Sequence, residues 1–132
     1  MLRWVLYLWA FPTTLLGLVL AGVTLLSGGR AQVVQGVLEI CGGASEFYLR
    51  RVVGLVLHGG ASAMTLGHVV LGRDLDLLEA TRAHERVHVR QCERWGPLFV
   101  PVYLGASLVA WMRGRRPYED NFLEREAFQF SA

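Results

Sequence analysis

The sequence predicts a small α+β domain that follows an apolar amino-terminal helix. Three observations support this fold class: a long uncharged run at the start, several short apolar stretches bounded by glycine, and a long amphipathic segment after them. The 132 residues suffice for one domain with a modest core. Hydrophobic residues make up 53% of the chain and charged residues 18%, so it is more apolar than a typical soluble domain.

The first element is the apolar helix. No residue from Trp4 to Leu26 is charged, and a helix of this length exceeds the hydrocarbon core of a bilayer, which is roughly 30 Å thick. A cleaved signal peptide would have a shorter apolar region, of about 7–15 residues. We therefore expect residues 1–30 to form a retained single-pass membrane anchor and residues 31–132 to form the folded domain. The flanking arginines do not determine the orientation of the anchor.

A short, mostly antiparallel sheet is expected next. Residues 32–41 are rich in β-branched side chains and end at two glycines, which predicts a strand and a turn. Residues 52–57 and 63–71 predict two further strands, each ended by a glycine-containing stop. Residues 44–51 are ambiguous between a short helix capped by Ser45 and an extended segment.

A long helix is predicted from Leu77 to Trp95. Asp76, with Glu79 three residues later, indicates a capping box, and Gly96 followed by proline supplies a stop. Helical spacing places six side chains on one face of this helix: Leu77, Thr81, His84, His88, Gln91 and Trp95.

Two more helices complete the expected order. The uncharged run Pro97–Met112 would be about 24 Å long if it were wholly helical, which is marginal for a membrane span. Glycine and proline follow it. The tail then indicates a capped helix that begins at Asp120 or Asn121.

Residues 84–88 read His-Glu-Arg-Val-His, an HExxH motif inside the predicted long helix. Positions i and i+4 lie on the same helical face, so His84 and His88 can present two imidazole nitrogens to one metal ion. Glu85 stands beside them to accept and donate a proton. The alternative is an ordinary solvated helix face, on which Arg82, Glu85, Arg86 and Arg90 form surface ion pairs.

A catalytic zinc site usually takes three protein ligands and leaves a fourth position for water. The carboxylates of the last helix are the natural candidates for the third ligand, and Glu119, Glu124 and Glu126 are the glutamates in that part of the chain. Cys92, one turn beyond His88, is a minor candidate. Glu124 has a competing role, because it follows Asn121 by three residues and could close a capping box. The residues that could support the site are His68, Tyr118, Asn121 and Glu126, although a structural role is favoured for His68 and a helix cap is the simpler account of Asn121.

A shared metal site restricts the topology. If Pro97–Met112 crossed the bilayer, the two histidines and the last helix would lie on opposite sides of it, and returning Glu124 would bring charged residues into hydrocarbon. We therefore expect this run to be a buried or interfacial helix packed behind the helix that carries the histidines.

The composition also limits the partners. A net charge of +2, with no basic stripe interleaved with aromatics, argues against nucleic-acid binding. The apolar amino terminus indicates the lipid bilayer as a partner. The two cysteines, Cys41 and Cys92, could form at most one disulfide, and neither the redox compartment nor the oligomeric state follows from the sequence.

The HExxH motif at His84–His88, followed by Glu124-Arg-Glu-Ala127, resembles the gluzincin class of zinc peptidases, and most closely its membrane-bound branch. The segments His84–Gln91 and Tyr118–Ala127 are also similar to small bacterial HExxH domains of unassigned function. The resemblance implies a minimal zincin-like fold, one Zn²⁺ ion and Glu124 as third ligand. It further implies an edge strand at residues 63–71 that aligns an extended peptide. Phe128 departs from the pattern, because the family has an aspartate there.

Two functions follow as expectations. The first is a membrane-anchored zinc metallopeptidase, in which Glu85 is the general base for hydrolysis of a peptide or protein substrate. The second is a non-catalytic small membrane protein with a structural or vestigial metal site. The replacement of the family's aspartate by Phe128 favours the second.

Overall fold

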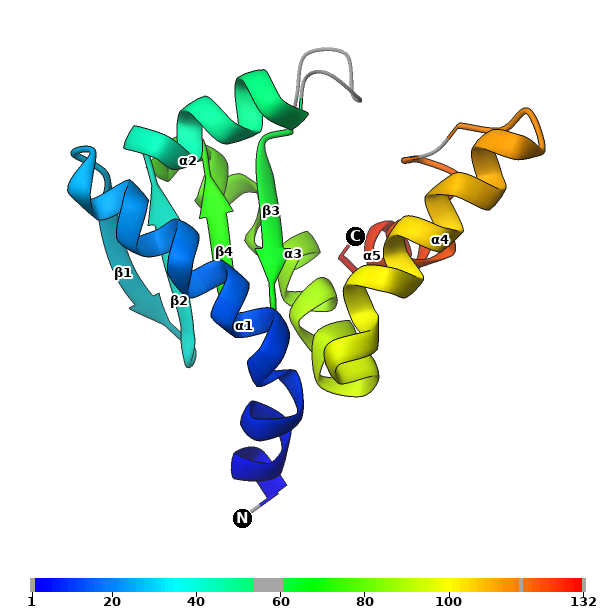
Figure 1. Cartoon of the computed structure of the whole chain (residues 1–132), viewed down its shortest axis with the longest axis horizontal. Coiled ribbons are helices and arrows are strands. Elements are labelled where there is room, and N and C mark those ends of the chain that lie inside the picture. The colour runs from blue at the N-terminus through cyan, green and yellow to red at the C-terminus, as the bar shows by residue number, and fades with distance from the viewer. Residues whose placement is uncertain (1, 54–60, 117, 132) are drawn as a thin grey trace.

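The computed structural model describes residues 2–53, 61–116 and 118–131. It is a mixed α+β domain in which a four-stranded sheet lies between helices (Figure 1). Helix α1 (Leu2–Leu26) crosses one face of the sheet, and helix α3 (Leu75–Trp95) packs against the other face. The α+β class expected from the sequence is confirmed.

The sheet has the strand order β1-β2-β4-β3. Its strands are β1 (Arg30–Val34), β2 (Val37–Cys41), β3 (Ala63–Leu66) and β4 (Val69–Gly72). The pairs β1–β2 and β3–β4 are antiparallel, whereas β2 and β4 run parallel, with Leu38 opposite Val69 and Cys41 opposite Gly72. The sheet is therefore mixed, although most of its pairings are antiparallel as expected.

Two segments predicted as single strands are hairpins. The segment 32–41 turns at Gln35 and Gly36, whose φ angles of 54° and 77° are the positive values that a two-residue hairpin turn requires. The segment 63–71 turns at Gly67, with φ 64°, and His68. The single-strand prediction was wrong because a continuous β-branched run does not show which of its glycines reverses the chain.

Alternation along the central strands builds two cores. Val69 and Leu71 of β4 join Ile40 and α1 on one face, while Val70 joins Leu78 and other residues against α3 on the opposite face. This period of two is the side-chain geometry of any strand, and β4 is buried on both sides because helices cover both.

The ambiguous segment 44–51 is helical. It forms α2 (Gly43–Phe47), which continues into the π-helical turn η1 (Tyr48–Val52). Ser45 does not cap it: its hydroxyl lies 2.7 Å from the Thr24 hydroxyl of α1. Because Val52 ends the π-helical turn, the strand expected at 52–57 does not begin there, and residues 54–60 lie outside the described residues.

Helix α3 begins two residues earlier than predicted. Asp74 is the N-cap, and its Oδ1 accepts a hydrogen bond from the Leu77 amide at 2.8 Å. The expected capping box at Asp76 was therefore wrong, since Asp76 lies within the first turn. The predicted end at Trp95 and Gly96 is confirmed.

The chain then runs through a short 3₁₀ turn, η3 (Gly96–Leu98), into α4 (Phe99–Met112) and finally α5 (Phe122–Ser131). Asn121 precedes α5, and its Oδ1 accepts a hydrogen bond from the Leu123 amide at 2.9 Å, so the predicted cap is confirmed.

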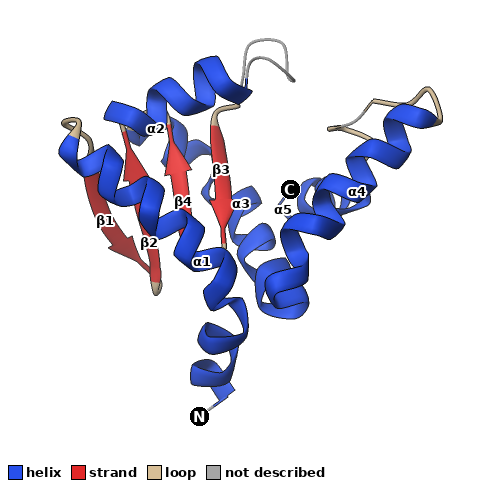
Figure 2. Cartoon of the chain, viewed as in Figure 1, coloured by secondary structure: helices blue, strands red, loops and turns tan. Residues whose placement is uncertain are grey.

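Helix α4 is less buried than expected. Its first turns pack with Cys92 and Leu123, but most of its later apolar side chains are exposed, and Figure 2 shows the helix extending away from the sheet. With 14 residues it is about 21 Å long, shorter than the hydrocarbon core of a bilayer. The expectation of a buried helix holds for its first turns and is wrong for its later ones.

Small residues let α1 approach the sheet closely. Its buried positions recur at helical spacing and are all small: Ala10, Thr13, Gly17, Ala21 and Thr24. Ala21 belongs to the same buried cluster as Ile40 and Leu71, so the described part of residues 1–30 shares a core with the sheet. Within the described residues, two helical stretches are long and apolar enough to cross a membrane: Trp4–Leu26 and the combined Leu75–Met112.

Replacing Gly17 by alanine should destabilise the protein, whereas the same change at Gly22 should not. A β-carbon at residue 17 would lie 2.7 Å from Val69 Cβ, but one at residue 22 would meet nothing within 4 Å. We expect the free energy of unfolding to fall by about 1–3 kcal/mol for Gly17→Ala. For Gly22→Ala it should rise by up to about 1 kcal/mol, because alanine favours the helix. Urea denaturation followed by circular dichroism measures both, and equal stabilities would contradict the packing of α1.

Candidate metal centre

Helix α3 supplies the first two side chains of the centre. His84 and His88 are one turn apart, so they project from the same face, and their ring centroids are 5.0 Å apart. His88 is buried and His84 is partly exposed. Their positions follow directly from the helix that the sequence predicted.

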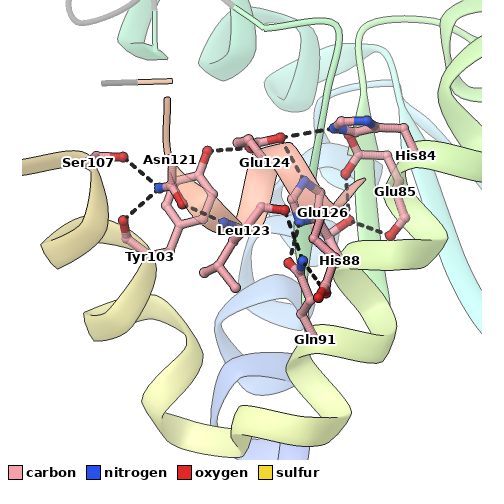
Figure 3. A network of polar contacts seen from close by, with 11 residues as sticks. His84, Glu85, His88, Gln91, Tyr103, Ser107, Asn121, Leu123, Glu124 and Glu126 are labelled. Atoms are coloured by element: carbon pink, nitrogen blue, oxygen red, sulfur yellow. Dashed lines mark hydrogen bonds and ion pairs between the residues drawn. The ribbon is translucent and has the colours of Figure 1, made fainter. Parts of the chain in front are cut away.

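Helix α5 supplies the third side chain. The Oε1 atom of Glu124 lies 2.9 Å from Nε2 of His84 and 2.9 Å from Nε2 of His88 (Figure 3). One potential ligand atom from each residue lies within 4.8 Å of the others. Two imidazole nitrogens and one carboxylate oxygen form the donor set of many catalytic zinc sites, so these residues fit a single metal ion.

The alternative third ligands lie elsewhere. Glu126 Oε1 accepts hydrogen bonds from Gln91 and Arg94, and Glu119 lies 3.6 Å from Arg116. Cys92 is buried as a free thiol in the apolar cluster between α3 and α4, where burial raises its pKa to about 12. Among the described residues, Glu124 alone joins the two histidines.

Gln91 fixes the orientation of His88. Its Oε1 lies 2.8 Å from His88 Nδ1, while its amide donates to the Leu123 carbonyl and to Glu126. Because the amide nitrogen is engaged by two acceptors, the Gln91 oxygen faces the imidazole and His88 Nδ1 donates to it. Nε2 is thereby turned towards Glu124, which is how an outer partner orients a metal-binding histidine.

Helix α4 holds the other side of Glu124. The Tyr103 hydroxyl donates to Glu124 Oε2, and the Asn121 amide donates to the Tyr103 carbonyl at 3.0 Å and to the Ser107 hydroxyl at 2.9 Å. Figure 3 shows this chain of contacts running from α4 through the start of α5 to the histidines. Asn121 therefore fixes the start of α5, the helix that carries Glu124, against α4.

Three side chains at the centre were not predicted from the sequence: Tyr103, Gln91 and Thr65, whose hydroxyl donates to Glu85. Tyr103 had no local signal, because it lies in an apolar run far from the motif. Gln91 shared the predicted face of α3 with the histidines, and that shared face is the signal from which its role could have been found.

His84 packs against the residue that departs from the family pattern. Its ring centroid is 4.5 Å from that of Phe128, which in turn contacts Tyr118 edge to face at 6.3 Å. An aromatic ring therefore stands where the resemblance leads one to expect a carboxylate. Tyr118 lies beside the centre, and burial together with the Glu124 charge raises the pKa of its hydroxyl.

Glu85 is turned from the histidine face towards the edge strand β3. Its Oε2 accepts a hydrogen bond from the Thr65 hydroxyl at 2.6 Å, and its side chain is buried. Burial raises the pKa of Glu85, against the opposing influence of His88. The HExxH helix thus offers a buried carboxyl group next to the two imidazoles.

A cavity of about 130 Å³ adjoins these groups. Glu85, His88 and Glu124 line it on one side, with β3 residues such as Met64 and Leu66 beside them. Helix α4 contributes Val100, Tyr103 and Leu104. The cavity is therefore mainly apolar, with its acidic and imidazole groups gathered at one place.

The solvated-face alternative required surface ion pairs between Glu85 and the arginines of α3. Arg82 and Arg86 do not form such pairs. Arg82 and Arg86 instead hold the buried Glu39 of β2, at 2.9 and 2.8 Å. Burial would raise the pKa of Glu39, but these hydrogen bonds outweigh it and the pKa is lowered. These contacts tie α3 to the sheet and fix the helix that carries the motif.

His68 does not join the centre. It lies in the turn between β3 and β4, where its Nε2 is 2.9 Å from Glu93 and its ring stacks on Tyr7 of α1 at 4.1 Å. Its position fits the structural role favoured for it over a supporting one, because Glu93 lies on a different face of α3 from the two motif histidines.

Glu124 and His88 form a charged pair in the metal-free protein. Burial would lower the pKa of His88, but its hydrogen bond and charge contact with Glu124 prevail and raise it to about 9. Burial would raise the pKa of Glu124, but hydrogen bonds from His84 and His88 lower it to about 2. A metal ion binding here would displace the proton of His88.

No protein-family model matches the chain, and no curated protein or solved structure was found to match it. The class is therefore defined by structure alone: a mixed α+β domain with a mostly buried His/His/Glu cluster beside a sheet edge.

The charged pair should make the stability of the metal-free protein depend on pH. The raised His88 pKa contributes stability that is complete below its unfolded value of 6.5 and is lost as the pH rises through about 9. The lowered Glu124 pKa contributes stability that is complete above 4.5 and is lost as the pH falls through about 2. The pair should thus stabilise the protein most between about pH 4.5 and 6.5.

Urea unfolding of chelator-treated protein at several pH values measures this dependence. In Glu124→Gln the decline in stability from pH 6.5 to 9 should shrink, because His88 loses its charged partner. Glu119→Gln, a change at a more exposed carboxylate, is the matched control and should keep the decline. The same decline in all three proteins would show that this pair is not its source.

Proposed function

We propose that the protein is a membrane-associated, zinc-dependent hydrolase of the metallopeptidase type with a minimal zincin-like fold. The observation that carries the proposal is the single Glu124 oxygen placed 2.9 Å from Nε2 of both His84 and His88. The buried carboxyl group of Glu85 beside them, open to a cavity, supports catalysis rather than a closed structural site.

Different residues of the chain would hold the metal ion, orient its ligands and transfer the proton. His84, His88 and Glu124 would hold the ion, with Gln91 and Tyr103 fixing two of these ligands. When bound, zinc lowers the pKa of a water molecule to about 7 and polarises a carbonyl group. Glu85 would accept a proton from the water molecule while the water oxygen bonds to the carbonyl carbon of a peptide. It would then give this proton to the peptide nitrogen as the C–N bond breaks. Thr65 holds the Glu85 carboxyl group in place for these transfers.

The edge strand β3 provides the substrate platform. It is the last strand of the sheet on the side of the cavity, and Ala63–Leu66 line that cavity. An extended peptide added along this edge would form backbone hydrogen bonds with β3 and pass beside Glu85. The apolar lining favours peptides with apolar side chains.

A second candidate function is a non-catalytic membrane protein with a structural or vestigial metal site. The contact between Phe128 and His84 favours it, because an aromatic ring cannot accept the hydrogen bond that usually raises the basicity of a metal-binding histidine. Both functions would use the same metal ligands, so metal binding does not separate them. They differ in whether the protein hydrolyses peptides.

Replacing Glu85 by glutamine should separate them. Glu85 moves protons and does not bind metal, so Glu85→Gln should retain zinc and lose at least about 100-fold in peptide hydrolysis. Metal content by mass spectrometry and cleavage of a mixed peptide library measure the two properties. The matched control is Glu79→Gln, an exposed change on the same helix, which should leave both unchanged.

Two results would count against the hydrolase. Absence of turnover in the wild-type protein that carries stoichiometric zinc would favour the non-catalytic function. Absence of bound metal after zinc reconstitution would remove both functions, because each requires the His84, His88 and Glu124 ligand set.

Replacing Gln91 by methionine should weaken zinc binding. The change keeps the volume of this buried side chain but removes the acceptor for His88 Nδ1 and the donor to the Leu123 carbonyl. We expect zinc affinity to fall by about 10–100-fold, the usual effect of losing such a partner. Competition with a chromophoric chelator measures it, with Gln129→Met at an exposed position as control. Unchanged affinity in a folded Gln91→Met protein would show that Gln91 does not orient the ligand.

A further inference from the structure

The two sides of α1 differ completely. The side that faces away from the sheet is apolar along its whole length, and its exposed residues include Leu8, Leu15, Val19 and Leu26. These positions recur at helical spacing, opposite the buried stripe of small residues. No residue from Trp4 to Leu26 is charged.

The inner side of α1 is held to the domain by polar contacts. Tyr7 donates to the Gly36 carbonyl at 2.8 Å, and Thr13 donates to the Gly96 carbonyl at 3.3 Å. Thr14 accepts from the His68 amide, and the Thr24 hydroxyl lies 2.7 Å from the Ser45 hydroxyl. The helix is therefore held to the rest of the domain by polar contacts from Tyr7 to Thr24, and Figure 1 shows its later turns crossing the face of the sheet.

This attachment is incompatible with α1 crossing a bilayer. A spanning α1 would carry the sheet into the hydrocarbon with it, including the open backbone edges of β1 and β3. Open sheet edges do not occur in lipid, because their amide and carbonyl groups have no partners there. The charged residues of β1 and β2, Arg30 and Glu39, would enter with them. Helix α1 is long enough to span a bilayer, and its packing against the sheet argues against that placement.

We propose that α1 lies in the plane of the membrane surface, with its outer side embedded in one leaflet and the sheet on the aqueous side. The partner is the lipid bilayer. The embedded side presents hydrocarbon, whereas the polar groups that hold α1 to the domain face inward and are hydrogen-bonded, so none of these is left unpaired in lipid. Protein interfaces, by contrast, carry a polar rim and regular hydrogen bonds.

Charge supports the same partner. The exposed apolar end of α4 at Trp111 and Met112 is followed at once by Arg113, Arg115 and Arg116, all exposed. Apolar residues followed by arginines suit the boundary between acyl chains and anionic headgroups. This inference does not depend on the metal centre, so it stands or falls separately from the proposed hydrolase.

The depth of nitroxide labels along α1 tests the proposal. Cysteine variants Leu8→Cys, Leu15→Cys, Val19→Cys and Leu26→Cys place labels on the outer side over about 27 Å of helix. The full-length protein would be bound to vesicles of equal parts phosphatidylcholine and phosphatidylglycerol. Collision rates with oxygen and with a water-soluble nickel complex then give the depth of each label. Glu79→Cys, exposed on α3, is the control and should stay in water.

An in-plane helix gives four labels at similar shallow depths in lipid. A profile that is deepest near Leu15 and shallow at Leu8 and Leu26 would overturn the proposal in favour of a spanning helix. Labels that remain in water, or that are shielded from both collision partners as in a contact with a second protein, would also overturn it. The native Cys41 and Cys92 are buried, so they should not be labelled in the folded protein, and circular dichroism confirms that each variant folds.

Discussion

The centre depends on one carboxylate oxygen shared between two imidazoles. Glu124 lies on the last helix, α5, and the histidines lie on α3. Their contact therefore requires the intervening chain, α4 and the residues that follow it, to bring α5 back against α3. Burying a carboxylate without hydrogen-bond partners costs free energy. Here the two histidines contact one oxygen of Glu124 and Tyr103 donates to the other, which offsets that cost. The three carboxy-terminal helices are therefore held in one arrangement by the same groups that would bind a metal.

The support around this contact is cooperative because each polar group serves two elements. Gln91 joins α3 to the start of α5, and Asn121 joins α5 to α4 while it also caps the helix. On the opposite side of α3, the buried Glu39 fixes the helix to the sheet through Arg82 and Arg86. Helix α3 is thus set by charge contacts on one face and by the histidine cluster on the other, which gives Glu85 a fixed place beside β3.

The apolar amino terminus has two roles that sequence patterning alone does not separate. Its small residues form a core with the sheet, and its large residues remain outside. A hydropathy pattern measures only the average of the two sides, which is why a membrane anchor and a domain helix have the same signature. The close approach at Gly17 shows that the inner side is part of the folded domain.

The sequence by itself determined the features that depend on neighbours within one helical turn: α3 and its stop, the facing pair His84 and His88, and a capped last helix that begins at Asp120 or Asn121. The resemblance added Glu124. Only the tertiary structure decided which apolar runs fold back as hairpins, that β2 and β4 run parallel, and that Tyr103 and Thr65 reach the centre. The reason is physical: helical contacts recur every three or four residues, whereas strand pairing and contacts between helices join residues whose separation in the chain carries no periodic signal.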